Sequence, residues 1–151
     1  MLMEAVAERI GWANPVPLDQ RNFAYPRLYA VITALAGPIS NFLLATIAFI
    51  MIKFFPAVFF SPAVTVTCIQ ILSATASINI MLGVFNILPI PPLDGSHILF
   101  ALLVRRFPAF VAWMYRYSLL MLIVLFMLPQ TRQFLSFLIT QTEQFIKSLI
   151  F

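Results

Sequence analysis

Charged residues are scarce in this sequence, and their scarcity excludes most soluble proteins. Only 9% of the 151 residues are charged, whereas 62% are hydrophobic. A soluble domain usually carries about 25% charged residues, because polar side chains must cover its surface. A disordered chain is excluded as well, since it would be poor in hydrophobic residues. The composition therefore indicates an integral membrane protein of one domain.

Residues that bind metals or transfer protons are also few. Cys68 is the only cysteine, which excludes a disulfide scaffold, and it is most simply a small buried residue. His97 is the only histidine. The nine basic residues are scattered and form neither a patch nor a tail, so nucleic acid is not an expected partner. The acidic residues are Glu4, Glu8, Asp19, Asp94 and Glu143.

Two long uncharged segments predict membrane-spanning helices. Residues 28–52 carry no charge, and a helix needs about 20 residues to cross the hydrocarbon core of a bilayer. Pro38 lies within this segment and should kink the helix. A second helix is expected over residues 63–88, and the prolines from Pro89 to Pro92 should end it.

Three shorter segments follow the proline-rich break. Helix is expected to resume over residues 95–104, and a third apolar segment runs over residues 110–128. Residues 134–151 have polar side chains in their middle, which fits either a short span or an interfacial helix. The expected fold is an all-α integral membrane protein with about three to four transmembrane helices, one of them a proline-broken helix that carries Asp94.

The distribution of basic residues predicts the orientation of these segments. Basic side chains precede the first span and follow the second, whereas the turn between the spans holds only Lys53. Because basic residues concentrate in cytoplasmic loops, we expect the N-terminus and the region 105–116 to face the cytoplasm. The chain is thus expected to be a multi-pass protein of the cell membrane. Residues 1–27 would be a cytoplasmic N-terminal segment and loop, and residues 28–151 a single membrane domain.

Asp94 is the sharpest candidate for a functional residue. It is the only acidic residue between Asp19 and Glu143, and it lies between two hydrophobic segments. Arg106 follows 12 residues later, which corresponds to about 18 Å along a helix. An ionisable group at such depth is costly and suggests a functional site. A carboxylate at a break in a helix suggests an ion or metal site.

Structural interpretations compete at each candidate residue. Asp94 is followed by Gly95 and could be the N-cap of the next helix, which does not exclude metal ligation. His97 lies about one helical turn further on and is a weak candidate to share a metal, since a lone histidine is more often structural. Asn41 and Asn86 lie on helix faces of small residues, where they could form helix–helix hydrogen bonds or face a substrate.

Three motifs in this sequence resemble the site-2 protease family, the membrane-embedded zinc metalloproteases of peptidase family M50. A-G-P-I-S-N at residues 36–41 is similar to the family's G-P-x-x-N segment. N-I-L-P-I-P-P-L-D-G at residues 86–95 resembles its N-x-x-P-x-P-x-L-D-G signature. G-W-A-N-P-V-P at residues 11–17 resembles a stretch of the family's short members. The resemblance covers most of residues 11–106, and the last 45 residues match only as generic membrane helix.

The resemblance implies roles for these residues. Asp94 corresponds to the aspartate ligand of the family's zinc ion, and Asn41 corresponds to an asparagine near the active site. Asn86 corresponds to the asparagine of the aspartate motif. The implied activity is cleavage of the transmembrane segments of substrate proteins within the lipid bilayer. The other motif residues, which would support the active site or its substrate, are Gly37, Pro38, Pro89, Pro92 and Gly95.

One part of the family's active site is absent from this sequence. Its two histidine ligands and its general base come from H-E-x-x-H, and a chain with a single histidine cannot contain that motif. A catalytic zinc site needs three protein ligands and an open position for water. We therefore expect an N-terminally truncated chain, inactive and without zinc on its own, whose missing upstream segment bears H-E-x-x-H. No catalytic residue is assigned within these 151 residues.

Two other functions are compatible with the sequence. A non-catalytic membrane scaffold could bind transmembrane segments through the helix faces around Asn41 and Asn86. A small transporter could also place an acidic residue at a broken helix, although the sequence shows no internal repeat.

Overall fold

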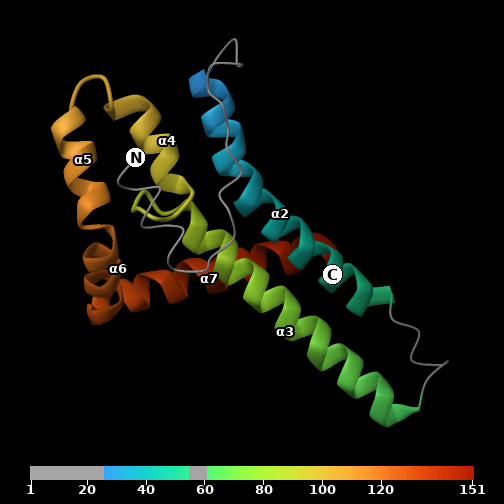
Figure 1. Ribbon diagram of the computed structural model, residues 1–151. Coiled ribbons are helices and arrows are strands. Elements are labelled where there is room, and N and C mark those ends of the chain that lie inside the picture. The colour runs from blue at the N-terminus through green and yellow to red at the C-terminus, as the bar shows by residue number, and fades with distance from the viewer. Residues whose placement is uncertain (1–25, 55–60) are drawn as a thin grey trace, which may run out of the picture.

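The computed structural model describes residues 26–54 and 61–151, which form helices and no strands (Figure 1). The predicted all-α fold is confirmed. Residues 1–25, most of the expected N-terminal segment and loop, lie outside the described residues. The helices are α2 (Pro26–Phe54), α3 (Pro62–Ile87), α4 (Gly95–Leu103), α5 (Pro108–Arg116), α6 (Ser118–Met127) and α7 (Pro129–Ile150).

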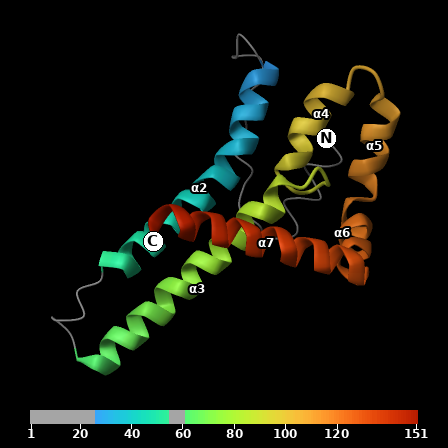
Figure 2. The ribbon, with the colours of Figure 1, turned by 180° about the vertical axis from the view of Figure 1, so that it is seen from behind.

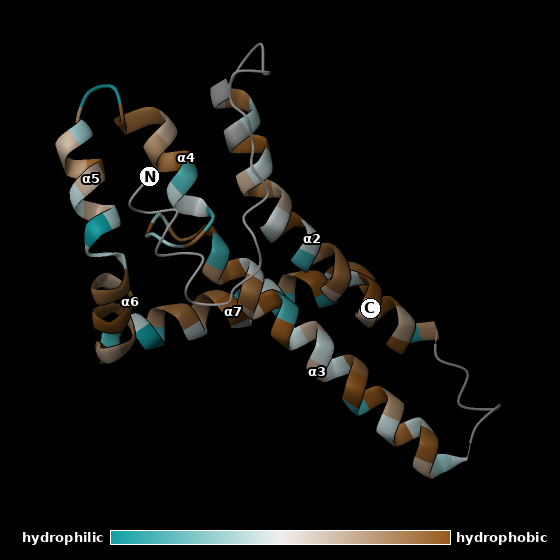
Figure 3. Ribbon diagram, viewed as in Figure 1, coloured by the Kyte–Doolittle hydropathy of each residue, from teal (hydrophilic) through white to brown (hydrophobic). Residues whose placement is uncertain are grey.

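Two of these helices are long and apolar enough to cross a membrane. They are α2, over Val31–Phe54, and α3, over Pro62–Ile87. The pair α5 and α6 makes a third candidate if the two count as one bent span. The sequence predicted three to four transmembrane helices, whereas the described residues contain two or three candidate spans. The hydropathy of the helices is shown in Figure 3, where hydrophobic residues dominate most of their length.

Small side chains allow α2 and α3 to pack closely against each other. Ala45, Ala48 and Ala76 are buried at their interface, together with the fully buried Ile80. A Cβ atom on Gly83 would lie 2.7 Å from Cε1 of the Phe42 ring, so the ring fills the space that a side chain would need. Membrane helices associate in this way because small residues let their backbones approach. α2 continues as one helix through the buried Pro38, and its axis curves in both views (Figures 1 and 2).

The helix α7 crosses the α2–α3 pair (Figure 2). Its buried residues Leu135 and Ile146 join the core formed by α2 and α3. At its C-terminal end the ammonium group of Lys53 donates a hydrogen bond to the backbone carbonyl of Ile150. Lys147 pairs with Glu143 at 2.6 Å. α7 begins at Pro129, before the expected segment 134–151. The face that carries Leu135 and Ile146 packs against α2 and α3.

The third apolar segment differs from its prediction. A single helix over residues 110–128 was expected, whereas the chain bends by 66° at Tyr117 between α5 and α6. Neither proline nor glycine marks this bend in the sequence. The two helices are held by different partners: the Tyr115 ring of α5 lies against Phe100 of α4, whereas Phe126 of α6 stacks on Phe85 of α3. The bend follows from these two tertiary contacts.

Candidate functional site

The break between α3 and α4 is a short, well-connected turn. The predicted helix end at the prolines is confirmed, since α3 ends at Ile87 and α4 begins at Gly95. Backbone hydrogen bonds continue across the break, from the Leu93 amide to the Ile90 carbonyl at 2.9 Å and from the Ser96 amide to the Leu93 carbonyl at 3.0 Å. The prolines lack amide donors, so the chain satisfies its remaining backbone groups in turns instead of a helix.

Gly95 allows the two helix ends to approach each other. A Cβ atom at this position would collide with the backbone carbonyl of Ile87 and would lie 2.7 Å from the carbonyl oxygen of Leu88. Ser96 is buried beside it, and its hydroxyl group donates to the Leu93 carbonyl at 2.7 Å. Gly95 is therefore required by sterics, and the turn holds the start of α4 in a defined position.

The carboxylate of Asp94 lies against α2 at Gly37. A Cβ atom on Gly37 would be 2.6 Å from Oδ2 of Asp94, so the absence of a side chain on Gly37 makes room for the carboxylate. The fully buried Pro38 follows Gly37 in α2. Two motifs that are far apart in the sequence, G-P-x-x-N and L-D-G, are thus in direct contact. Figure 1 shows the turn and the start of α4 beside α2 and α3.

The side chain of Asp94 does not cap the helix that follows it. Asp94 occupies the N-cap position of α4, but its backbone is helical, with φ −57° and ψ −37°, and its side chain makes no capping hydrogen bond. Helix capping by the side chain therefore does not account for Asp94. The residue is partly buried, and its carboxylate forms no hydrogen bond or ion pair with any residue of 26–54 or 61–151. A carboxylate removed from water without a partner favours a cation as ligand.

The other predicted residues differ in how far they are buried. Asn41 and Asn86 are partly buried, and neither amide side chain hydrogen bonds with a described residue. The expected helix–helix hydrogen bonds are thus not formed within the described part of the chain. Pro89 and Pro92 are exposed on the turn, and His97 is exposed on α4.

Two residues of the turn were not among the predicted site residues. Pro91 and Ser96 are fully buried and hold the turn in place. The sequence signal for Ser96 was its position directly after Asp94 and Gly95, where a short side chain can bond back to the turn. Pro91 was visible only as one of several prolines.

Comparison with known proteins agrees with the motifs. The sequence model of peptidase family M50 matches residues 57–128, which include the turn and Asp94. The chain is also 36% identical over 121 residues to YwhC of Bacillus subtilis (strain 168), whose name assigns it provisionally as a zinc metalloprotease. Both comparisons support the resemblance to peptidase family M50. The alignment covers 79% of this chain and 55% of YwhC, so the chain spans about half the length of that relative. No solved structure matches the chain.

The described residues do not complete a zinc site. Within residues 26–54 and 61–151, no group of three histidine, cysteine or acidic side chains could hold a metal ion. Asp94 alone supplies one oxygen ligand, whereas a catalytic zinc site needs three protein ligands. The donor set therefore does not fit zinc without further residues.

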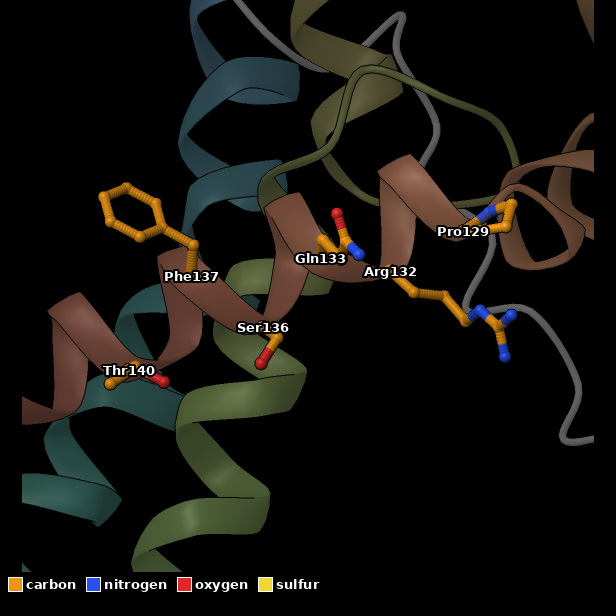
Figure 4. A pocket seen from close by; sticks show the side chains of 6 residues that line it. All are labelled: Pro129, Arg132, Gln133, Ser136, Phe137 and Thr140. Carbon is orange, nitrogen blue, oxygen red and sulfur yellow. The ribbon is translucent and has the colours of Figure 1, made fainter.

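A hollow elsewhere on the surface is separate from the motifs. It has a volume of about 640 Å³ and follows one side of α7 (Figure 4). None of the residues that line it belongs to the predicted site. They are Pro129, Arg132, Gln133, Ser136, Phe137 and Thr140.

Proposed function

We propose that this chain is the part of a membrane-embedded, site-2-type zinc metalloprotease that carries the aspartate ligand. The observation that carries the proposal is the contact between Asp94 and Gly37, which joins the two family motifs. The carboxylate is partly buried and has no partner among the described residues. A metal ion would supply the charge that this carboxylate lacks. The substrates would be transmembrane segments of other proteins.

In this proposal, the remaining zinc ligands come from residues outside this sequence. One carboxylate cannot hold a catalytic zinc ion, and the only histidine, His97, is exposed on α4. In this proposal, a segment with H-E-x-x-H supplies two histidines and the general base. The 151 residues alone would then be inactive and free of stoichiometric zinc.

The neighbouring motif residues would position Asp94 and the substrate. Gly37 leaves space for the carboxylate, and Gly95 permits the turn that presents it. The unpartnered amides of Asn41 and Asn86 are suited to hydrogen bonding with an extended substrate backbone, which has free amide and carbonyl groups inside a membrane.

The same proposal places the protein in the cell membrane as a multi-pass chain with a cytoplasmic N-terminus. The candidate spans α2 and α3 support the membrane location. The basic residues at 105, 106 and 116 support the orientation, because they follow the second span. Cysteine substitutions at Leu28 and Ser61, labelled in intact cells with an impermeant maleimide, test it in a Cys68→Ala background. Only the cysteine at Ser61 should react, and reaction at Leu28 alone would reverse the orientation.

The decisive test of the function measures zinc binding by a longer protein that includes an upstream H-E-x-x-H segment. The gene is sequenced upstream of Met1 in the same frame, and the protein that contains any H-E-x-x-H found there is purified. We expect about one zinc ion per chain. Asp94→Ala removes a direct ligand and should weaken zinc binding by more than the roughly 10- to 100-fold cost of losing an outer-shell partner. Glu143→Gln is the matched control, since Glu143 is the other described acidic residue and pairs on α7. Zinc binding that is unchanged in Asp94→Ala would overturn the proposal.

A non-catalytic scaffold is the second candidate function. The observation that favours it is the incomplete donor set of the described residues. Under this alternative, a stop codon would precede Met1 directly, and the 151-residue chain would bind transmembrane peptides without cleaving them. Asn41→Ala and Asn86→Ala should then weaken the binding, whereas Asp94→Ala should not.

A further inference from the structure

Three arginine residues flank the helix α5 without acidic neighbours. Arg105 and Arg106 lie in the turn between α4 and α5, and Arg116 is the last residue of α5. All three are exposed. The sequence has no acidic residue between Asp94 and Glu143, and Glu143 pairs with Lys147. The positive charge around α5 is therefore not balanced by any residue of 26–54 or 61–151. Figure 3 shows the hydrophilic turn at the end of α4.

The outer face of α5 and the Tyr117 residue that follows it carry a row of aromatic side chains. Phe110, Trp113 and Tyr117 follow one another at the three- and four-residue spacing of one helix face, and they are 47%, 50% and 40% exposed. The Phe110 and Trp113 rings stack with centroids 6.1 Å apart, and Trp113 and Tyr117 are 5.6 Å apart. The guanidinium group of Arg116 lies 6.0 Å from the centroid of the Tyr117 ring.

The inner face of α5 holds this row in place. Val111 and Met114 are buried and pack with Phe100 of α4. The Tyr115 ring lies 4.7 Å from the Phe100 ring. Because one face is packed on α4, the aromatic row points away from the protein as a preformed surface. Such a surface loses little side-chain freedom when a ligand covers it.

We propose that the α4–α5 turn and the outer face of α5 bind the headgroups of anionic phospholipids. Tryptophan and tyrosine prefer the boundary between lipid chains and water, where one part of the ring system is apolar and the other is polar. Arginine next to this boundary attracts phosphate groups and anionic lipid. The same chain has helices long and apolar enough to cross a membrane, which favours lipid over a soluble polyanion as the ligand of this surface. The turn supplies the charge, and the aromatic row supplies contact with the upper part of the acyl chains.

The size of the expected preference follows from the charge. A basic residue near an anionic membrane surface strengthens the attraction by about fivefold. Arg105 and Arg106 together should therefore enrich anionic over zwitterionic lipid near α5 by at least several-fold, and by up to about 25-fold if their effects multiply. Because the effect is electrostatic, salt above the physiological concentration should reduce it.

Trp113 provides a direct probe of this surface. The sequence contains two tryptophans, so Trp12→Phe leaves Trp113 as the only indole. The full 151-residue chain is placed in phosphatidylcholine vesicles that contain a small fraction of brominated lipid, either phosphatidylglycerol or phosphatidylcholine. Bromine quenches tryptophan fluorescence on contact. We expect brominated phosphatidylglycerol to quench Trp113 several-fold more than the same fraction of brominated phosphatidylcholine.

Three variants separate charge from folding. Arg105→Gln with Arg106→Gln should remove most of the preference, whereas Arg105→Lys with Arg106→Lys should keep most of it. Arg132→Gln, on the exposed face of α7, should leave the preference unchanged. Equal quenching by the two brominated lipids would overturn the proposal, as would a preference that survives in the double glutamine variant. The test requires no zinc and no proteolysis, so its result is independent of the proposed enzyme activity.

Discussion

The two halves of the described structure are held together in different ways. In α2, α3 and α4, helices approach through glycine and alanine, and Gly37, Gly83 and Gly95 each face an atom that an added Cβ would meet. The helices α5, α6 and α7 make contacts through large side chains, such as Phe126 of α6, whose ring stacks on Phe85 of α3 at 5.3 Å. Contacts through glycine tolerate changes of only tenths of an ångström, whereas large side chains can adjust.

The candidate functional residues lie in only one of these two halves. Asp94, Asn41 and Asn86 all lie in the half where the backbones are close. A ligand must be held within about 0.5 Å of its working position, and close backbone packing provides such a constraint. The other half carries the bend at Tyr117 and the exposed aromatic row on α5. Substitution of a glycine therefore tests how closely the backbones approach each other. Substitution of an aromatic residue tests how much a contact between large side chains contributes to stability.

The largest effect is expected for Gly95→Ala. The new methyl group would collide with the backbone carbonyls of Ile87 and Leu88, and no side-chain rotation relieves a collision with backbone. We expect a loss of about 3 kcal/mol or more in the free energy of unfolding, at the upper end of the cost of overpacking. Thermal unfolding in detergent and the yield of monodisperse protein measure it. The exposed substitution Ala63→Ser should change stability by less than about 0.5 kcal/mol, and a Gly95→Ala protein of normal stability would contradict this account.

Gly83→Val should have the next largest effect. Three ring atoms of Phe42 lie within 3.0 Å of the position of the new Cβ, so the ring must move or the helices must separate. We expect a destabilisation of about 2 kcal/mol. The double variant Gly83→Val with Phe42→Ala frees the space and should recover part of the loss relative to Phe42→Ala alone. A double-mutant cycle with no coupling energy would show that the two residues are not in contact.

Much of the membrane architecture could be predicted from single residue types. The absence of charge over residues 28–52 predicted α2, and the prolines from Pro89 to Pro92 predicted the end of α3 within one residue. These features are local, because hydrophobicity and a missing amide donor act on the segment that contains them. The bend at Tyr117 could not be predicted, since it depends on the contacts of α5 with α4 and of α6 with α3.

The candidate site could be predicted as a set of residues and not as a geometry. Family motifs identified Asp94 and Gly37, but no spacing in the sequence shows that Oδ2 of Asp94 fills the space beside Gly37. The local pattern even suggested a competing role for Asp94 as a helix cap. Asp94 does occupy the N-cap position of α4, but its side chain makes no capping hydrogen bond. A cap is a local preference, and packing against α2 prevailed over it.

A smaller effect is expected where rings meet. Phe126→Leu keeps an apolar side chain but removes the stack with Phe85, which is worth about 1 kcal/mol beyond the buried area. The unfolding temperature should fall slightly, and Phe85→Leu should lower it by a similar amount. The two changes together should cost less than their sum, because both remove the same contact. A strictly additive result would mean that the stack contributes nothing.

Gly37→Ala is expected to have the smallest effect on stability. It should nevertheless displace the carboxylate of Asp94. The methyl group would approach Oδ2 of Asp94, but a carboxylate at the end of a side chain can rotate away at little cost. Alanine is also preferred over glycine within a helix by about 1 kcal/mol, which offsets that cost. The unfolding temperature should therefore stay nearly constant, while zinc affinity falls in the protein that contains H-E-x-x-H. In an Asp94→Ala background, Gly37→Ala should lower neither the unfolding temperature nor the zinc affinity any further. The carboxylate oxygen that the new methyl group would displace is already absent. A large loss of stability in Gly37→Ala alone would show instead that Gly37 serves helix packing, as Gly83 does.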